Sequence, residues 1–355
     1  MKKIYLFLIV MAAICCTSCN NEWEDEQFSQ MASFKAVPNS SGVTSAYVRY
    51  NLGGVVRYSL PVLISGSTLN SQNRTVHIAL DEDTLKSLNY ERYGNRDKLY
   101  YQKIDNQYYK MPETVVVPAG ESMVAFPIDF TLGGLGNSNP LDLTDKYILP
   151  LSIVDDASYD YQSNPRKHYR KALLNITPYN DYSGTYDGSL LKIYLEDQGD
   201  AFTVANHKAY VVDDKTIFVY MGLRDEDYLD RKDYKLFIRF TDEMIIPGKY
   251  KLELWTDNKG DQAQGIPGNN FDLLTEKAND GTIRDIQPYY ILDTQDDPAK
   301  PYLKHVYITL YMAYSFEDYT LSPGQILKYK VDGTLSMERK LNTLIPDEDQ
   351  QIQWD

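Results

Sequence analysis

A tryptophan beside a cluster of amides and carboxylates is the most informative chemical pattern in the sequence. Trp255 ends an apolar stretch, and Asp257, Asn258 and Gln262 follow it in a long polar segment. An aromatic face can stack on the C–H face of a sugar ring, while amides and carboxylates exchange hydrogen bonds with its hydroxyl groups. The pattern therefore predicts a carbohydrate-binding site. A Trp255 that only anchors the core is the alternative.

A second candidate platform is the pair Tyr289 and Tyr290, which follows Pro288. Neighbouring residues of a β-strand point to opposite faces of the sheet, so at most one of the two rings can line a given site. Packing inside the fold is the alternative for both rings. The chain contains 31 tyrosines and 11 phenylalanines. Tyrosine suits strands with one face exposed to water, because its ring packs on the sheet while its hydroxyl stays hydrated.

Residue types that commonly catalyse reactions or bind metals show no recognisable arrangement. The four histidines lie in separate segments without the spacing of metal ligands. Residues 257–261 offer oxygen ligands around a glycine, but they lack the regular acid series and the final glutamate of a calcium loop. The sequence has no Gly-x-Ser-x-Gly elbow, and nothing singles out a catalytic pair among its 50 acidic residues. We therefore predict a protein that is not an enzyme, uses no cofactor and has no assigned metal site. For residues 257–261 a plain polar turn is the preferred interpretation, and a calcium loop is the alternative.

The N-terminal segment predicts where the protein is located. Two lysines precede an apolar run over residues 4–14, which is shorter than the roughly 20 residues that cross a bilayer. The run leads into Thr-Ser-Cys, which resembles the lipobox of bacterial lipoproteins, whose cysteine is acylated and becomes the first mature residue. We expect residues 1–19 to be a signal peptide and Cys19 to be the lipid anchor. An ordinary cleaved signal is the alternative.

Residues 20–30 are polar and acidic and lack apolar periodicity, which predicts a disordered tether. The acidic cluster directly after Cys19 resembles the surface-export signal of Bacteroides-type lipoproteins. That resemblance implies an outer-membrane protein that faces the extracellular side and touches the membrane only through Cys19. A solvated linker without an export role is the alternative.

The charge balance excludes some partners. Loss of two lysines with the signal changes the net charge from −14 to −16. An acidic chain repels phosphate backbones and anionic membrane surfaces, so we predict no nucleic-acid partner and no basic membrane patch. Because all three cysteines lie within the first 19 residues, the mature chain would contain no disulfide.

Between residues 31 and 178, short alternating apolar segments are separated by turn-forming residues, which is typical of an immunoglobulin-like β-sandwich. An Asp81 N-cap predicts one short helix that carries Leu85 and Leu88. Three prolines inside apolar runs predict sheet edges or bulges, namely Pro61, Pro127 and Pro150. The expected strands cover residues 43–50, 55–64, 74–80, 113–117, 122–130, 147–154 and 169–176.

Residues 179–345 carry a second series of strand signals joined by short turns, which predicts an antiparallel meander that is closed, or nearly closed, into a barrel. Asp332 and Gly333 predict a tight hairpin within the last strand. Residues 346–355 are acidic and predict a loose tail. The expected strands cover residues 189–195, 208–212, 216–221, 234–240, 249–256, 283–292, 302–314 and 325–339.

Three motifs in the first half carry a family resemblance. They are Val-Val-Val-Pro-Ala-Gly-Glu over residues 115–121, Val-Ala-Phe-Pro-Ile over 124–128 and Tyr-Ile-Leu-Pro-Leu-Ser-Ile over 147–153. Together they resemble the N-terminal domain of unknown function of lipoproteins encoded in Bacteroides-type polysaccharide-utilisation loci. The resemblance covers about residues 30–178 and brings no catalytic residues with it.

The second half is similar to the companion C-terminal domain of the same lipoproteins. Its opening Gly-Thr-Tyr and its closing segment over residues 331–339 carry that similarity. Some of these domains look calycin-like, and family members are typically surface glycan-binding proteins. The resemblance also implies an outer-membrane transporter and its lipoprotein partners as neighbours.

Taken together, the sequence predicts an all-β protein in which an immunoglobulin-like sandwich precedes a meander or calycin-like barrel. Its predicted function is to bind an oligosaccharide or polysaccharide at the cell surface for an uptake system, without catalysis. Two alternatives stay open. One is a carrier of lipid or another small apolar ligand in a lipocalin-like barrel, which would need an open apolar cavity. The other is a purely structural subunit of an outer-membrane uptake complex.

Overall fold

The computed structural model describes residues 29–133, 139–196, 199–260, 265, 267–278, 281–322 and 324–346. The predicted signal peptide, Cys19, nearly all of the tether, Gln262 and residues 347–355 lie outside the described residues. Within the described chain, no helix combines the length and the apolarity needed to cross a membrane.

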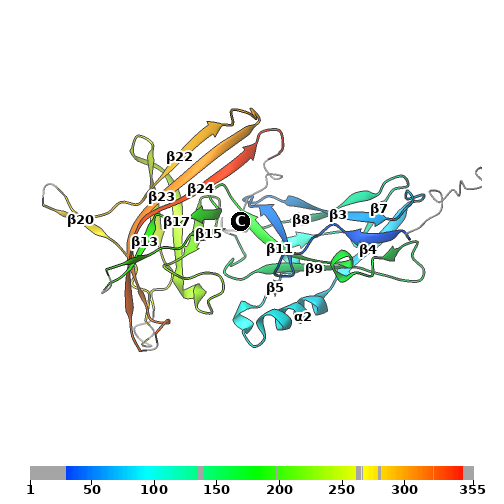
Figure 1. Cartoon of the computed structure of the whole chain (residues 1–355), viewed down its shortest axis with the longest axis horizontal. Coiled ribbons are helices and arrows are strands. Elements are labelled where there is room, and N and C mark those ends of the chain that lie inside the picture. Colours follow the sequence, from blue (N-terminus) through cyan, green and yellow to red (C-terminus); the bar gives the residue numbers. More distant parts are fainter. Residues whose placement is uncertain are drawn as a thin grey trace, which may run out of the picture.

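The chain is all-β and forms two lobes that lie side by side (Figure 1). We call residues 31–179 the first lobe and residues 184–342 the second lobe. The first lobe contains a five-stranded sheet in the order β10-β1-β3-β8-β6 and a six-stranded sheet in the order β2-β11-β9-β4-β7, with β5 beside β9. Its strands are β1 (Met31–Phe34), β2 (Thr44–Arg49), β3 (Val56–Ser65), β4 (Arg74–Leu80), β5 (Gln102–Lys103), β6 (Tyr109–Lys110), β7 (Thr114–Val117), β8 (Met123–Phe130), β9 (Tyr147–Ile153), β10 (Gln162–Ser163) and β11 (Lys171–Tyr179).

The two sheets of the first lobe enclose one hydrophobic core, as the predicted sandwich requires. Leu60 and Val62 of β3 and Leu149 and Leu151 of β9 are completely buried in it. Alternate residues of each strand supply this core because neighbouring side chains point to opposite faces. The short helical elements lie outside it and are α2 (Glu82–Tyr93), η1 (Asp97–Leu99), η2 (Asn106–Tyr108) and α3 (Lys167–Arg170).

The predicted helix is α2, which begins after Asp81 as expected. The Asp81 carboxylate accepts a hydrogen bond from the Thr84 backbone N–H at 3.1 Å, which satisfies a donor that the first helical turn leaves open. Leu85 is buried in a small second core with Ile148 of β9, and Leu88 packs against that core. The helix therefore covers the outer face of the six-stranded sheet.

The prediction that the prolines mark sheet edges or bulges is wrong, because they lie in strands β3, β8 and β9, which have neighbours on both sides. A physical reason is visible at two of them. The Pro61 carbonyl accepts from the Lys35 N–H at 2.9 Å, just beyond the end of β1, and the Pro150 carbonyl accepts from the Asp81 N–H at 3.0 Å, just beyond the end of β4. Pairing of β3 with β1 ends at Val62, and pairing of β9 with β4 ends at Leu151, so each proline lies one residue beyond the end of the ladder on that side.

The second lobe is a closed antiparallel barrel, in agreement with the predicted meander. In the described chain, its ring runs β12-β15-β16-β17-β18-β22-β23-β24 and closes where β24 pairs with β12. Strands β13, β14 and β19 extend this sheet, and β20 and β21 form a separate hairpin. The elements are β12 (Gly184–Asp187), β13 (Leu191–Leu195), β14 (Ala201–Phe202), β15 (Asn206–Val211), β16 (Thr216–Tyr220), η3 (Arg231–Tyr234), β17 (Lys235–Ile246), β18 (Lys249–Trp255), β19 (Asp272–Leu273), β20 (Thr275–Lys277), β21 (Ile283–Asp285), β22 (Tyr289–Asp296), β23 (Leu303–Asp318) and β24 (Leu327–Asn342).

The hairpin predicted at Asp332 and Gly333 is absent from this part of the structure, because β24 runs without interruption from Leu327 to Asn342. Gly333 has φ +140°, and a Cβ atom there would lie 2.1 Å from the Leu190 carbonyl oxygen. The glycine therefore allows a close approach to the segment before β13 and makes no turn.

Side chains fill the inside of the barrel. Tyr186, Phe240, Leu310 and Leu335 are all at most 1% exposed and belong to one hydrophobic core. Burial raises the pKa of Tyr186 far above its usual value, so its hydroxyl stays neutral. This packing gives no support to the lipid-carrier alternative, which needs an open apolar interior.

The two lobes also share core residues. Tyr210 and Val211 of β15 and Phe218 and Tyr220 of β16 are buried in the hydrophobic core of the first lobe. The Asn180 side chain, between the lobes, donates to the Asp213 carbonyl oxygen at 2.7 Å. The contact between the lobes thus combines shared apolar core residues with a hydrogen bond.

Candidate functional site

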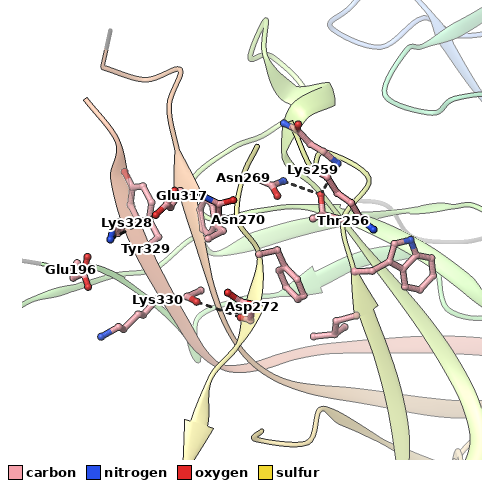
Figure 2. Close-up of a pocket in the computed structure, with 16 residues that line it drawn as sticks. Glu196, Thr256, Lys259, Asn269, Asn270, Asp272, Glu317, Lys328, Tyr329 and Lys330 are labelled. Atoms are coloured by element: carbon pink, nitrogen blue, oxygen red, sulfur yellow. Dashed lines mark hydrogen bonds and ion pairs between the residues drawn. The ribbon is translucent and has the colours of Figure 1, made fainter. Parts of the chain in front are cut away.

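The barrel wall has an opening between β18 and β23, in the part where β22 no longer lies between them. β22 begins at Tyr289, which pairs with Lys251, so pairing between β18 and β22 ends there. On the other side, β23 pairs with β22 only as far as Tyr311, and Ser315 pairs with the short strand β19 instead. A pocket of about 720 Å³ lies in this opening. Figure 2 shows the side chains that line it.

A loop that returns from β18 forms one wall of the pocket. Within it, the Asn269 N–H donates to the Asn258 carbonyl oxygen at 3.2 Å, and the Asn269 carbonyl oxygen accepts from the Glu317 N–H at 2.7 Å. A Cβ atom on Gly268 would lie 2.4 Å from the carbonyl carbon of Lys259, so only glycine lets the two arms of the loop approach so closely. These contacts join the returning arm of the loop to its outgoing arm and to β23.

The Asn269 side chain is the most deeply buried amide in the wall, with no exposed surface. Its Nδ2 donates to the Asp233 carbonyl oxygen at 3.1 Å and to Thr256 Oγ1 at 2.9 Å, and Figure 2 shows the second contact. Its Oδ1 has no hydrogen-bond partner among the described residues. A buried acceptor without a donor is unusual in a folded protein and needs an explanation.

The next residue, Asn270, has φ +42° and is the one described non-glycine residue with a positive φ. Its Nδ2 donates to Glu317 Oε2 at 2.5 Å, which turns this side chain towards β23. A left-handed conformation costs free energy for residues with a side chain, and such strain tends to occur at functional sites.

Aromatic rings complete the pocket. Phe316 of β23 stacks on Tyr329 of β24 with ring centroids 5.1 Å apart, and half-buried Phe271 lies 5.6 Å from Tyr314. Burial raises the pKa of Tyr329, so its hydroxyl remains neutral at physiological pH. The pocket therefore combines apolar ring surface with the amides of the loop.

Among the described residues that line the pocket, charged side chains of both signs occur in equal numbers. Lys328 lies 3.7 Å from Glu317, which is a partly exposed ion pair. The lysines of the lining are Lys259, Lys328 and Lys330, and its carboxylates are Glu196, Asp272 and Glu317. The formal charges of these described lining residues therefore balance, although the whole chain is strongly acidic.

Two of the predicted site residues, Trp255 and Asn258, line this pocket. The Trp255 ring stacks on Phe237 of β17 at 5.4 Å, and the Arg239 guanidinium lies 5.1 Å from its centroid. Because Leu254 packs on the barrel core, alternation directs the Trp255 ring to the outer face of β18. Asn258 Nδ2 donates to the Tyr319 hydroxyl at 2.6 Å, so its amide shapes the loop.

The other predicted residues do not line the pocket or lie outside the described residues. Asp257 forms an ion pair with Lys235 at 3.3 Å. Tyr290 is buried in the barrel core, while Tyr289 stacks on Tyr311 at 5.1 Å and has the Lys249 ammonium 4.0 Å from its centroid. Neither tyrosine lines the pocket. Gln262 lies outside the described residues.

The sequence analysis missed Asn269, Asn270 and Phe271. The segment Gly268-Asn269-Asn270-Phe271 lies in the same polar stretch as Trp255 and also places amides beside an aromatic ring. That pattern could have singled it out. Among the described residues, no cluster of three or more His, Cys, Asp or Glu side chains could hold a metal ion.

Comparison with known families divides the chain into two matched parts. Residues 23–157 match a family described as Domain of unknown function (DUF4973), and residues 170–336 match a family described as a C-terminal domain. The comparison with curated proteins found no match.

Several solved structures resemble nearly the whole chain. A protein of unknown function from Bacteroides ovatus is 36% identical, with a TM-score of 0.74 over 92% of this chain and 98% of that one. A multidomain protein including DUF1735 from Bacteroides ovatus is 38% identical, with a TM-score of 0.72 over 92% and 100%. An auxiliary nutrient binding protein from Bacteroides thetaiotaomicron is 36% identical, with a TM-score of 0.73 over 89% and 97%.

Proposed function

The chain belongs to the family of Bacteroides proteins that these structures represent, and we propose that it is a non-catalytic binding protein that captures a glycan nutrient at the cell surface. The observation that carries the proposal is the pocket between β18 and β23. Its lining includes the rings of Phe271 and Tyr329 together with amide and charged side chains. A sugar-binding site needs both, because rings pack on the C–H face of a sugar and polar groups form hydrogen bonds with its hydroxyls.

Two further observations support the proposal. A full-length relative with 36% identity is described as an auxiliary nutrient binding protein. The lipobox-like sequence before Cys19 and the acidic residues after it suit a protein that is anchored by lipid and displayed outwards. In this function, an outer-membrane transporter and its lipoprotein partners would receive the bound glycan.

The test is binding of the full-length protein to an array of plant, host and microbial glycans, followed by titration of the best ligand. We expect at least one glycan to bind and Phe271→Ala to weaken its binding at least tenfold, because stacking on the ring is lost. Phe202→Ala is the matched control, since Phe202 is exposed on β14 and does not line the pocket.

Three outcomes would contradict the proposal. Absence of binding to every glycan, together with co-purification of an outer-membrane transporter, would favour the structural-subunit alternative. Equal affinity of Phe271→Ala and Phe202→Ala would place the site elsewhere. Release of shorter products from a bound glycan would show that the protein is an enzyme.

A further inference from the structure

The pocket continues onto the outer face of β23, which runs side by side with β22 and β24 (Figure 1). The even-numbered residues of β23 from 308 to 316 belong to the barrel core, so alternation directs the odd-numbered side chains to the outer face. Ser315 of this face lines the pocket, and Tyr311 and Tyr307 follow it along the strand. With the rise of a β-strand, each of these steps of four residues spans about 13 Å. One face of one strand therefore connects the pocket with both rings.

Two stacked tyrosines form a platform on this face, next to the pocket. Tyr289 of β22 pairs with Tyr311, and the two ring centroids are 5.1 Å apart. The Tyr311 hydroxyl donates to Asp332 Oδ1 at 3.0 Å. Asp332 pairs with Ala313, which lies between Tyr311 and Ser315, so this hydrogen bond directs the Tyr311 side chain towards the pocket. The ring surface of the platform thus begins close to the pocket.

Tyr307 provides a separate ring farther along the same face. Its side chain is 37% exposed, and the His305 ring lies nearly parallel to it, with centroids 6.3 Å apart. Between Tyr307 and Tyr311, the face carries the small hydroxyl side chains of Thr309 and its cross-strand neighbour Ser336. Small side chains leave space above the sheet, so one flat ligand can contact both rings. We call Tyr289, Tyr307, Thr309, Tyr311 and Ser336 the strip.

The residues on and beside the strip fit a sugar chain better than a protein partner. Protein interfaces place large apolar side chains at their centre and are depleted of charged residues there. The strip instead has the carboxylates of Asp293 and Glu338 opposite Tyr307, and its aliphatic neighbour Ile291 is half-buried. Rings that alternate with hydroxyls and carboxylates suit a saccharide, because rings pack on its C–H faces and the polar groups form hydrogen bonds with its hydroxyls.

From these observations we infer that the ligand is an extended glycan chain, of which one part occupies the pocket and the next part lies along the strip. Sugar rings of this second part stack on Tyr311 and Tyr307. Both contacts are made by one chain, so the second forms at a high effective concentration once the first is in place. This inference rests on the proposed function and adds to it that the protein recognises a polysaccharide segment longer than the pocket.

The test measures the affinity of the full-length protein against chain length. The probes are xylo-, manno-, cello- and laminari-oligosaccharides of two, four, six and eight units, together with the same lengths of any other glycan that binds in the array. For the series that binds most tightly, we expect the affinity to rise at least tenfold from two to eight units. A longer chain also offers more overlapping registers, but that statistical gain does not depend on the strip, so variants separate the two.

Variants of the strip are compared by the ratio of eight-unit to two-unit affinity, with Tm as the check of folding. Tyr311→Ala removes a ring of the platform and should lower this ratio at least fivefold, whereas Tyr311→Phe keeps the ring and should keep the ratio. Tyr307→Ala should lower the ratio at least threefold. Tyr169→Ala is its matched control, because Tyr169 is also 37% exposed but lies in α3 of the first lobe. Phe271→Ala should weaken every length alike, because its ring lines the pocket.

The outcomes separate this inference from the proposed function. A wild-type affinity that rises less than tenfold from two to eight units would overturn the inference, although the proposed glycan-binding function would stand. An unchanged ratio in folded Tyr311→Ala and Tyr307→Ala would also overturn it, because the gain with length would then come from another surface or from overlapping registers. Absence of binding to every probe and every glycan of the array would overturn the proposed function and this inference with it.

Discussion

Arg231 Nη2 donates a hydrogen bond to the carbonyl oxygen of Lys98 at 2.8 Å, across the contact between the two lobes. The same guanidinium donates from Nε to the Thr144 carbonyl oxygen at 2.8 Å and lies 3.1 Å from Asp145. With only 3% of its surface exposed, Arg231 inserts from η3 into the first lobe. A buried cation that is satisfied by three partners of the other lobe joins the sandwich and the barrel into one body.

Removal of this link should destabilise the whole protein. We expect Arg231→Ala to lower the free energy of unfolding by about 3 kcal/mol, because several buried hydrogen-bonding groups lose their partner. Unfolding in urea measures the change. Lys232→Ala is a matched control, because Lys232 pairs with the same Asp145 at 2.7 Å but is half exposed, and it should cost at most about 1 kcal/mol. Equal losses in the two variants would contradict the role given to Arg231.

Glu226 should make the contact between the lobes sensitive to acid. Burial by itself would raise the pKa of Glu226, but Lys146, Lys208 and the Tyr210 hydroxyl outweigh burial and lower the pKa to about 2. In an unfolded chain the pKa of a glutamate is about 4.3. The charged carboxylate therefore stabilises the folded state above about pH 4.3, and this contribution is lost as the pH falls towards 2.

The measurement is Tm against pH for the wild type and Glu226→Gln. The wild type should have the higher Tm at pH 7, and the difference should shrink between about pH 4.3 and 2. A difference that stays constant over this range would show that Glu226 keeps an ordinary pKa in the folded protein.

Gly268 should be required for the pocket wall. A Cβ atom at this position would lie 2.4 Å from the carbonyl carbon and 2.6 Å from the carbonyl oxygen of Lys259, and backbone atoms cannot move aside cheaply. We expect Gly268→Ala to cost about 1–3 kcal/mol and to weaken ligand binding. Gly199→Ala is the control, because a Cβ atom there meets no atom within 4 Å and the φ of Gly199 is not positive. Retained stability and affinity in Gly268→Ala would show that the loop tolerates a wider separation.

Trp255 should contribute more to stability than to binding. Its ring stacks on Phe237 and lies against Arg239 on the outer face of β18. Trp255→Ala should lower the stability by about 2 kcal/mol, roughly half the loss for a fully buried tryptophan, and should change glycan affinity less than threefold. A tenfold loss of affinity at unchanged Tm would instead support the sugar platform that the sequence predicts.

Cys19 should decide whether the protein stays with the membrane. Cys19→Ala removes the thiol that a lipid would acylate, so label from a radioactive fatty acid should be lost and the protein should leave the membrane fraction. Protease treatment of intact cells should degrade the wild-type protein if it faces outwards. Fatty-acid labelling that persists in Cys19→Ala would refute the anchor, and full protection from protease would refute the orientation.

Local patterns in the sequence determined the elements of this protein. Period-two alternation predicted most strands of both lobes, and an Asp81 cap predicted α2, because these signals depend on residues that are neighbours in the chain. The same is true of Trp255 and the polar segment after it, from which Trp255 and Asn258 line the pocket. The lipobox at Cys19 is also local, although its consequence for location stays a prediction.

Only the tertiary structure decided which strands pair with each other and which side chains come into contact. Ring closure depends on Asp187 meeting Ser336, nearly 150 residues away, and no local pattern encodes that register. Other long-range pairings place Gly333 in a strand beside β13 and put Pro61 in a strand with neighbours on both sides. The tertiary structure also determined that Asn269 would lie buried with an unpaired oxygen while Tyr290 packs in the core, because the partners of a side chain come from strands that are distant in the sequence.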